Sequence, residues 1–152
     1  MSNSSDPADD PVGHAALVAA ELAVRELSAR YCMAVDDGRF EEFAELYEPD
    51  AVLHVMGGSH RGRDSIREFM SAAQSPELRG RHTTSSHVTT LDVAAGTGSG
   101  WVDYVFFDAD GHATNLGRYH DRYVRGADGR WRFAVREIVF RGAKPELTEP
   151  WA

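Results

Sequence analysis

The chain contains a single cysteine, Cys32, and lacks both a cluster of basic residues and a long apolar run. One cysteine excludes an intrachain disulfide and is typical of a protein in a reducing compartment. The 16 basic residues are outnumbered by 24 acidic ones, and the net charge of -8 argues against binding to nucleic acid or to an anionic membrane surface. No stretch approaches the roughly 20 consecutive apolar residues of a membrane-spanning helix. We therefore expect a cytoplasmic protein that binds neither nucleic acid nor membrane.

The chain also lacks the motifs of several catalytic classes. Its seven histidines show no His-Glu-x-x-His spacing, so no metal site is predicted. The glycine-rich segment 96–100 lies between two predicted strands, whereas a phosphate-binding loop lies between a strand and a helix. Cys32 falls in an amphipathic helical pattern without an adjacent basic residue, which makes it a poor nucleophile. We expect no cofactor.

The length of 152 residues suits one domain with a single core. Residues 1–11 are polar and acidic, and we expect them to form a disordered tail. The domain is expected to span residues 12–142, followed by a C-terminal tail over residues 143–152.

The first part of the domain has a helical pattern. Apolar residues recur at steps of three and four from Leu17 to Ala34, which predicts a helix that ends near Asp36. Gly38 can then adopt the left-handed conformation that often follows a helix. Shorter helices are predicted around residues 40–47 and 64–74, with a strand at 51–56 between them.

From residue 81 onward the apolar period changes to two, which indicates strands. Four runs cover about 81–93, 99–107, 112–125 and 130–141, and Asp-Gly pairs mark hairpin turns before the third and fourth runs. Helices followed by an antiparallel meander predict an α+β fold, in which the helices cover one face of a curved sheet. The concave side of such a sheet can leave a pocket.

Several local motifs follow one another in this order, and they span roughly residues 16 to 142. They are Tyr31-x4-Asp36-x-Gly38-Arg39-Phe40, Leu46-Tyr47-x-Pro49-Asp50-Ala51, His60-Arg61-Gly62-Arg63-Asp64-Ser65-Ile66, Arg81-His82, Gly117-x-Tyr119-x-Asp121-x-Tyr123 and Asp128-Gly129-x-Trp131-x-Phe133-x-x-Arg136. The chain thereby resembles the nuclear transport factor two-like superfamily, and within it the SnoaL-like branch that includes scytalone dehydratase, a hexachlorocyclohexane dehydrochlorinase and bile-acid dehydratases. The resemblance implies a cone-shaped, curved antiparallel sheet packed on three N-terminal helices.

The resemblance also implies a catalytic pair formed by His82 and Asp36. His82 would act as the general base, and Asp36 would hold the imidazole in one tautomer and stabilise its protonated form. The alternatives are a polar histidine at the entrance of a strand and an acid at the C-terminus of a helix, in an Asp-Asp-Gly turn. Regular strand alternation would place Ser86 on the same face as His82 and His87 on the opposite face. In related proteins an asparagine often stands at the position of Ser86, so Ser86 is a candidate substrate-binding residue.

Two further residues complete the predicted site. Tyr31 lies on the apolar side of the first helix, where its hydroxyl could meet a substrate oxygen or could belong to the core. Arg136 lies among apolar residues of the last strand, so it should either stabilise an anion or form a salt bridge with an acid such as Asp36 or Asp103. The strand aromatics could line a pocket for a flat ligand, and Tyr104 and Tyr119 are the candidate substrate-binding residues among them.

The predicted function is that of a cofactor-independent dehydratase, another lyase or an isomerase. The substrate would be small, hydrophobic and cyclic, such as a polyketide-, steroid- or aromatic-like molecule. A polyketide cyclase could use the same pair of residues. A non-catalytic binding or scaffold subunit, like the small subunits of ring-hydroxylating dioxygenases, is the alternative from another class. An open pocket beside His82 and Asp36 would favour an enzyme, whereas an interior filled by aromatic rings would favour the scaffold. We expect a homo-oligomer, either a dimer or a trimer.

Overall fold

The structure of the protein, a computed structural model, describes residues 10–141. Residues 1–9 and 142–152, which hold most of the two expected tails, lie outside the described part. The elements in chain order are α1 (Pro11–Asp36), α2 (Phe40–Glu45), β1 (Tyr47–Val55), β2 (Gly58–Arg61), α3 (Arg63–Ala73), β3 (Arg81–Asp92), β4 (Thr97–Phe107), β5 (Ala113–Arg125) and β6 (Trp131–Phe140). The α+β class is confirmed, and β2 is an additional strand that was not expected.

The first helix, α1, starts and ends at residues that favour helix boundaries. It begins at Pro11, inside the expected tail, and the side chain of Asp10 accepts a hydrogen bond from the backbone N–H of Gly13 at 3.0 Å. It ends at Asp36, and Gly38 has a φ of 70°, the left-handed conformation that the sequence predicted. A side chain at Gly38 would also overlap the guanidinium group of Arg79.

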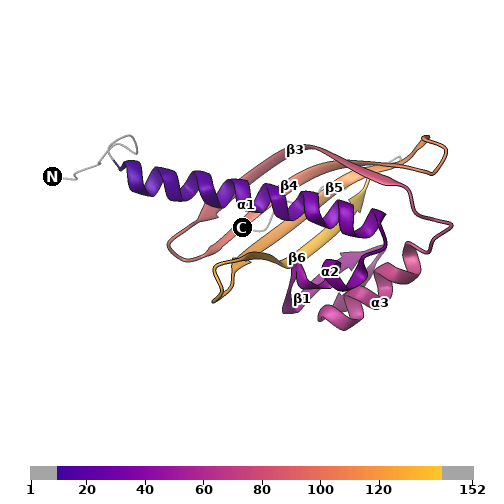
Figure 1. The fold of residues 1–152 in the computed structure, drawn as a ribbon, viewed down its shortest axis with the longest axis horizontal. Coiled ribbons are helices and arrows are strands. Elements are labelled where there is room, and N and C mark those ends of the chain that lie inside the picture. The colour runs from indigo at the N-terminus through magenta and orange to yellow at the C-terminus, as the bar shows by residue number, and fades with distance from the viewer. Residues whose placement is uncertain (1–9, 142–152) are drawn as a thin grey trace.

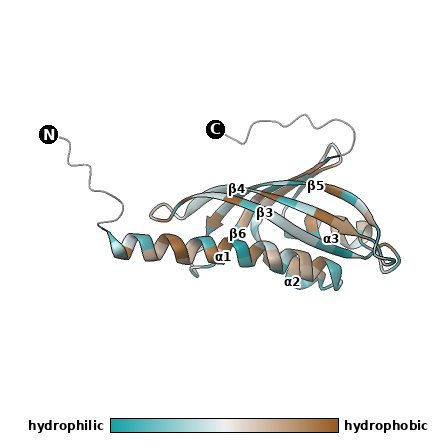
Figure 2. Ribbon diagram, turned by 90° about the horizontal axis from the view of Figure 1, so that it is seen from above, coloured by the Kyte–Doolittle hydropathy of each residue, from teal (hydrophilic) through white to brown (hydrophobic). Residues whose placement is uncertain are grey.

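The strands form one curved sheet in the order β2-β1-β6-β5-β4-β3. Strands β3 to β6 form the expected antiparallel meander, while β1 pairs in parallel with β6 and antiparallel with β2. Figure 1 shows α1 running across the concave face of the sheet, with α2 and α3 near β1 at one end. Figure 2 shows the same two layers from above, with the long strands curving over α1.

The core lies between the helices and the concave face. It is rich in aromatic side chains, and the rings of Tyr31, Phe43, Tyr47 and Phe133 contact one another with centroid separations of 5.2 to 5.9 Å. Burial of side chains of this size contributes about 1.5–3 kcal/mol each. Within residues 10–141, no helix is both long and apolar enough to cross a membrane.

Candidate active site

Asp36 and His82 meet where the end of α1 faces the beginning of β3. Nδ1 of His82 lies 2.6 Å from Oδ1 of Asp36, and the backbone N–H of His82 donates to Oδ2 at 2.9 Å. A carboxylate only accepts hydrogen bonds, so Nδ1 is the donor, and in the neutral imidazole Nε2 is the nitrogen that carries the lone pair. The side chains are only 10% and 5% exposed. The expected contact between the two residues is therefore confirmed, whereas their catalytic role stays a proposal.

The backbone around His82 explains how the pair is held. Gly80 precedes the strand, and a Cβ atom there would lie 1.9 Å from the carbonyl oxygen of Phe107. Only glycine permits this close approach, which brings the start of β3 against the end of β4. On the inner side, the ring of Phe106 lies 4.7 Å from the His82 imidazole, measured between centroids. His82 is thus held between an acid on one side and an aromatic ring on the other.

Arg136 is fully buried and pairs with Asp121, not with Asp36 or Asp103 as the sequence analysis suggested. Its Nε and Nη2 atoms donate to the two carboxylate oxygens at 2.8 and 2.7 Å. Asp103 instead pairs with Arg118, at 2.6 Å, on the convex face. The pKa of Arg136 is raised well above its ordinary value, because the Asp121 carboxylate outweighs the opposing effect of burial. Arg136 is therefore a permanent cation whose charge is already balanced.

The guanidinium of Arg136 is enclosed by aromatic rings. It lies 4.2 Å from the ring centroid of Tyr31 and 4.0 Å from those of Tyr119 and Phe133. Its Nη1 atom is buried and has no hydrogen-bond partner within the described residues. Tyr31 points inward as predicted, and burial raises the pKa of its hydroxyl above the ordinary value. Tyr31 consequently stays protonated and is available as a hydrogen-bond donor.

Tyr104 and Tyr119 also face the concave side. Their rings are stacked at 4.4 Å with an interplanar angle of 7°, and the Tyr104 hydroxyl lies 3.4 Å from Oδ1 of Asn115. A Cβ atom at Gly117 would lie 2.8 Å from the Tyr104 ring, so this glycine provides the space for the stack. Both tyrosines face the interior and are at most 4% exposed, and their contact with a ligand stays a prediction.

The predicted placement of Ser86 is wrong. The pairing of β3 with β4 shifts between Thr84, which lies opposite Tyr104, and His87, which lies opposite Val102. Two residues of β3 therefore occupy the space of one residue of β4, and this bulge reverses the alternation. Ser86 is exposed, and His87 takes the inward position in its place. Simple alternation cannot reveal a bulge of this kind.

Three buried or half-buried residues of the interior were not predicted as site residues: Asp121, Tyr123 and His87. The Tyr123 hydroxyl donates to Oδ2 of Asp121 at 2.9 Å and lies 3.4 Å from Nε2 of His87. Asp121 was detectable in principle, because strand alternation places it between Tyr119 and Tyr123 on an aromatic face, where an acid requires a partner.

Neither the thiol nor the histidines provide another reactive group of comparable geometry. Burial raises the pKa of the Cys32 thiol to about 12, so it stays protonated and unreactive. Contrary to the spacing argument, His112 does lie close to two acids, Asp108 and Asp110, with ligand atoms within 4.8 Å of one another. This cluster belongs to the exposed β4–β5 turn, where Asp108 already accepts backbone N–H bonds from Asp110 and His112.

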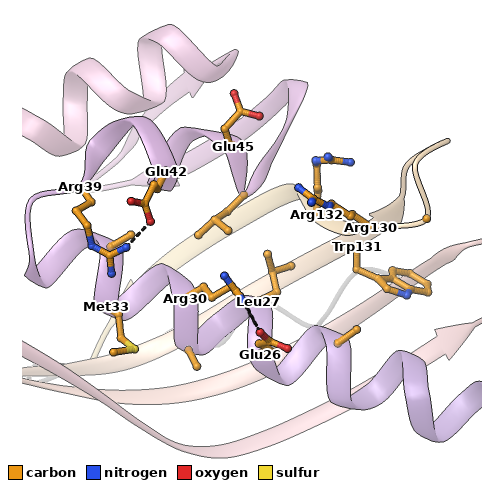
Figure 3. A pocket seen from close by; sticks show the side chains of 15 residues that line it. Glu26, Leu27, Arg30, Met33, Arg39, Glu42, Glu45, Arg130, Trp131 and Arg132 are labelled. Atoms are coloured by element: carbon orange, nitrogen blue, oxygen red, sulfur yellow. Dashed lines mark hydrogen bonds and ion pairs between the residues drawn. The ribbon is translucent and has the colours of Figure 1, made fainter.

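A large groove lies outside the concave interior. It has a volume of about 860 Å³ and runs between α1, α2 and the turn before β6, as Figure 3 shows. Four of its charged side chains form two ion pairs, Arg30 with Glu26 and Arg39 with Glu42. Neither this groove nor a smaller pocket of about 360 Å³ beside the β1–β2 hairpin is lined by His82 or Asp36. We place the candidate site at the His82–Asp36 pair because the structure shows no comparable acid–histidine contact among the residues that line the groove.

The curved sheet packed on helices is a small α+β fold of the nuclear transport factor two-like, or cystatin-like, type. The sequence model of the SnoaL-like domain matches residues 16–137, and the chain belongs to that family. No protein with a curated description matches its sequence.

Solved structures support the assignment of the fold. A variant of a Mycobacterium tuberculosis protein of unknown function is 27% identical with a TM-score of 0.77, and the match covers 93% of this chain and 80% of that one. A nuclear transport factor two-like protein with a cystatin-like fold from Novosphingobium aromaticivorans is 24% identical, with a TM-score of 0.75 and coverages of 90% and 93%. A protein provisionally assigned as scytalone dehydratase, from the same organism, is 19% identical, with a TM-score of 0.71 and coverages of 85% and 89%. At these identities, the last two show a common fold.

Proposed function

We propose that this protein is a cofactor-independent lyase or isomerase that removes a proton from a hydrophobic cyclic substrate. The observation that carries the proposal is the contact between Asp36 and His82. The carboxylate engages Nδ1, and the opposite ring nitrogen, Nε2, has no hydrogen-bond partner within the described residues. This arrangement suits a general base whose orientation is fixed by an acid.

In the proposed reaction, Nε2 of His82 takes a proton from a carbon next to a carbonyl or a leaving group. The electron pair of the broken C–H bond forms a double bond, and negative charge develops on the carbonyl oxygen or on the departing group. Tyr31 would donate a hydrogen bond to that oxygen. Arg136 would donate a second hydrogen bond to the same oxygen from Nη1, its one unpaired nitrogen. General base catalysis supplies roughly 10²–10⁴-fold, and donors aimed at the developing charge supply about as much again.

The charge balance favours a neutral substrate over an acid. Because Asp121 already neutralises Arg136, a substrate carboxylate would meet no net positive charge there. The same proton abstraction would start an elimination of water in a dehydratase or an intramolecular aldol step in a cyclase. We favour the dehydratase because the spacing of Tyr31 and Asp36 resembles that of the dehydratases in this superfamily.

A second candidate function is a non-catalytic binding or scaffold subunit. It is favoured by one observation: the interior beside the pair is filled by the rings of Tyr31, Tyr104 and Tyr119, each at most 4% exposed. A substrate would have to displace or slide between these rings.

The proposal can be tested without knowing the natural substrate. Solvent-deuterium exchange of the α-protons of 2-tetralone and of steroid-like cyclic ketones, followed by NMR, measures proton abstraction directly. His82→Gln should lower the exchange rate by roughly 10²-fold or more at an almost unchanged thermal midpoint. Asp36→Asn should cause a comparable loss, and the double variant should lose no more than either single one. His112→Gln, in the exposed β4–β5 turn, is the matched control and should exchange like the wild type.

Exchange that survives both substitutions would move the chemistry to another part of the interior. If the wild type exchanges no ketone of the panel and both variants unfold, the pair is structural and the scaffold function is the better description.

A further inference from the structure

The bulge in β3 places a second histidine on the face that carries His82. Tyr104 and Val102 of β4 point into the interior, where they are 4% and 0% exposed. The residues opposite them, Thr84 and His87, therefore point inward as well. Without the bulge, Ser86 would occupy the inward position that His87 takes. Because of the bulge, the interior contains two imidazoles from one strand, those of His82 and His87.

A chain of hydrogen bonds connects His87 to the buried ion pair. Its Nε2 lies 3.4 Å from the Tyr123 hydroxyl, which in turn lies 2.9 Å from Asp121, the partner of Arg136. The Asp121 carboxylate can only accept, so the hydroxyl proton of Tyr123 points to it. The hydroxyl oxygen is then left to accept from His87, which places the imidazole proton on Nε2. Nδ1 consequently holds a lone pair.

The surroundings of His87 keep the ring neutral. The groups that face it are Arg25 from α1, Asp121 and Tyr123 from β5, and Arg136 from β6. The pKa of His87 is lowered to about 4, chiefly by burial; the two arginines also lower it, and Asp121 offsets part of the effect. At neutral pH the ring therefore acts as a hydrogen-bonding group without a charge.

We propose that His87 is a ligand-binding residue, and that its Nδ1 atom accepts a hydrogen bond from an uncharged hydroxyl group of a bound molecule. Within residues 10–141, the Tyr123 hydroxyl is the only hydrogen-bond partner of the His87 ring, so Nδ1 is uncommitted. The His87 side chain is only half-buried, so its ring is not closed off from solvent. The inference rests on the proposed function in one respect, namely that a small molecule enters this interior.

The position of His87 also indicates the shape of the ligand. With a rise of about 3.3 Å per residue, and one residue absorbed by the bulge, the Cα atoms of His82 and His87 are roughly 13 Å apart along β3. A molecule that reaches both imidazoles would need its hydroxyl far from the reacting carbon, at a separation typical of two or more fused rings. A carboxylate in place of the hydroxyl would offer no proton to Nδ1 and would face the Asp121 charge.

A matched pair of probes tests the hydroxyl contact. 2-Naphthol and 2-methoxynaphthalene have the same ring system, but only the first can donate a hydrogen bond. By calorimetry, the wild type should bind 2-naphthol roughly five- to tenfold more tightly, the worth of one neutral hydrogen bond. His87→Phe should reduce this preference to less than about twofold, and His87→Asn, whose amide oxygen can replace Nδ1, should restore part of it. Ser86→Ala, on the outward neighbour, should keep the full preference.

The proposal is overturned if the wild type binds both probes equally, if it binds 2-naphthol too weakly to detect, or if the preference survives in His87→Phe. A second measurement needs no ligand. The ¹⁵N shifts of the His87 ring at pH 7 should show a neutral imidazole protonated at Nε2, and Tyr123→Phe should remove the fixed tautomer. A protonated Nδ1 in the wild type would overturn the proposal even if Tyr123→Phe fails to fold. Neither readout measures turnover, so this inference and the proposed lyase activity can fail separately.

Discussion

Arg136 and Asp121 form an ion pair with no solvent exposure on either side chain. Removing one partner leaves the other as an uncompensated buried charge, which costs about 3–5 kcal/mol. We therefore expect Arg136→Met or Asp121→Leu to lower the free energy of unfolding by about this amount, measured by urea denaturation. The double variant should recover part of the loss, because an apolar pair leaves no charge unpaired.

The exposed pair of Arg30 and Glu26 on α1 provides the control, since its side chains are 67% and 60% exposed. Arg30→Ala should change the free energy of unfolding by at most about 0.5 kcal/mol. Equal effects at Arg30 and Arg136 would contradict the view that burial determines the importance of the inner pair.

His87 should make the protein sensitive to mild acid. Its pKa falls from an ordinary value of 6.5 to about 4 in the folded protein, so between these values the unfolded chain binds more protons than the native one. The contribution of neutral His87 is thus complete above pH 6.5 and is lost as the pH falls through 4. The thermal midpoint of the wild type should drop more between pH 7 and pH 4.5 than that of His87→Asn. If the thermal midpoints of the two proteins fall equally between pH 7 and pH 4.5, His87 does not titrate in this way.

At the residue level, candidate site residues were easier to predict from the sequence than the partners that they contact. Asp36 and His82 were predicted as a pair because the family motifs and the conflict of an acid with the helix C-terminus both pointed to them. The partner of Arg136 was missed, because Asp121 is one of 24 acidic residues and only the register of β5 against β6 places it opposite the arginine.

At the level of the elements, the order and the approximate bounds followed from apolar periodicity and turn residues. The four long strands lie within two residues of the predicted ranges, and Gly111 and Gly129 have the positive φ values expected of hairpin turns. Two features could not be predicted from this periodicity. The parallel pairing of β1 with β6 is a long-range contact, and the bulge in β3 breaks the period of two without a local marker.

The stack of Tyr104 on Tyr119 depends on a glycine in the neighbouring strand. A methyl group at Gly117 would lie 2.4 Å from the carbonyl oxygen of Val139 and 2.8 Å from Tyr104, so backbone and ring would both have to move. We expect Gly117→Ala to destabilise the protein by about 1–3 kcal/mol in urea denaturation and to alter the near-ultraviolet circular dichroism of the tyrosines. Gly58→Ala is the control, because its nearest neighbour would be 3.5 Å away. A Gly117→Ala protein with the spectrum and stability of the wild type would show that the interior can rearrange freely.

For the whole molecule, the convex face of the sheet is the best candidate for self-association. Val88 and Leu116 are 66% and 49% exposed there, and Trp101 lies directly opposite Val88. Exposed apolar side chains on one face of a sheet are typical of contact surfaces, so we expect a dimer or trimer. Light scattering at tens of micromolar should give a mass above that of one chain, and Leu116→Lys should shift it toward the monomer.

Met33 offers a matched control for this experiment, because it is 60% exposed on α1, away from the convex face. Met33→Lys should leave the mass unchanged. A wild-type protein that scatters as a monomer would refute the prediction, and dissociation caused by Met33→Lys instead would move the interface to the helix.

Asp36 binds both the imidazole and the main chain of His82, and His82 lies at the start of β3, which is the outer strand of the sheet. The same carboxylate therefore ties down a sheet edge and orients a ring. Strand edges are among the first parts of a protein to open below the global melting temperature. Fraying of β3 at that end would separate the two groups while the rest of the barrel stays folded. The temperature range over which the pair keeps its alignment is then limited by the opening of one strand end, and greater overall stability alone would not widen it.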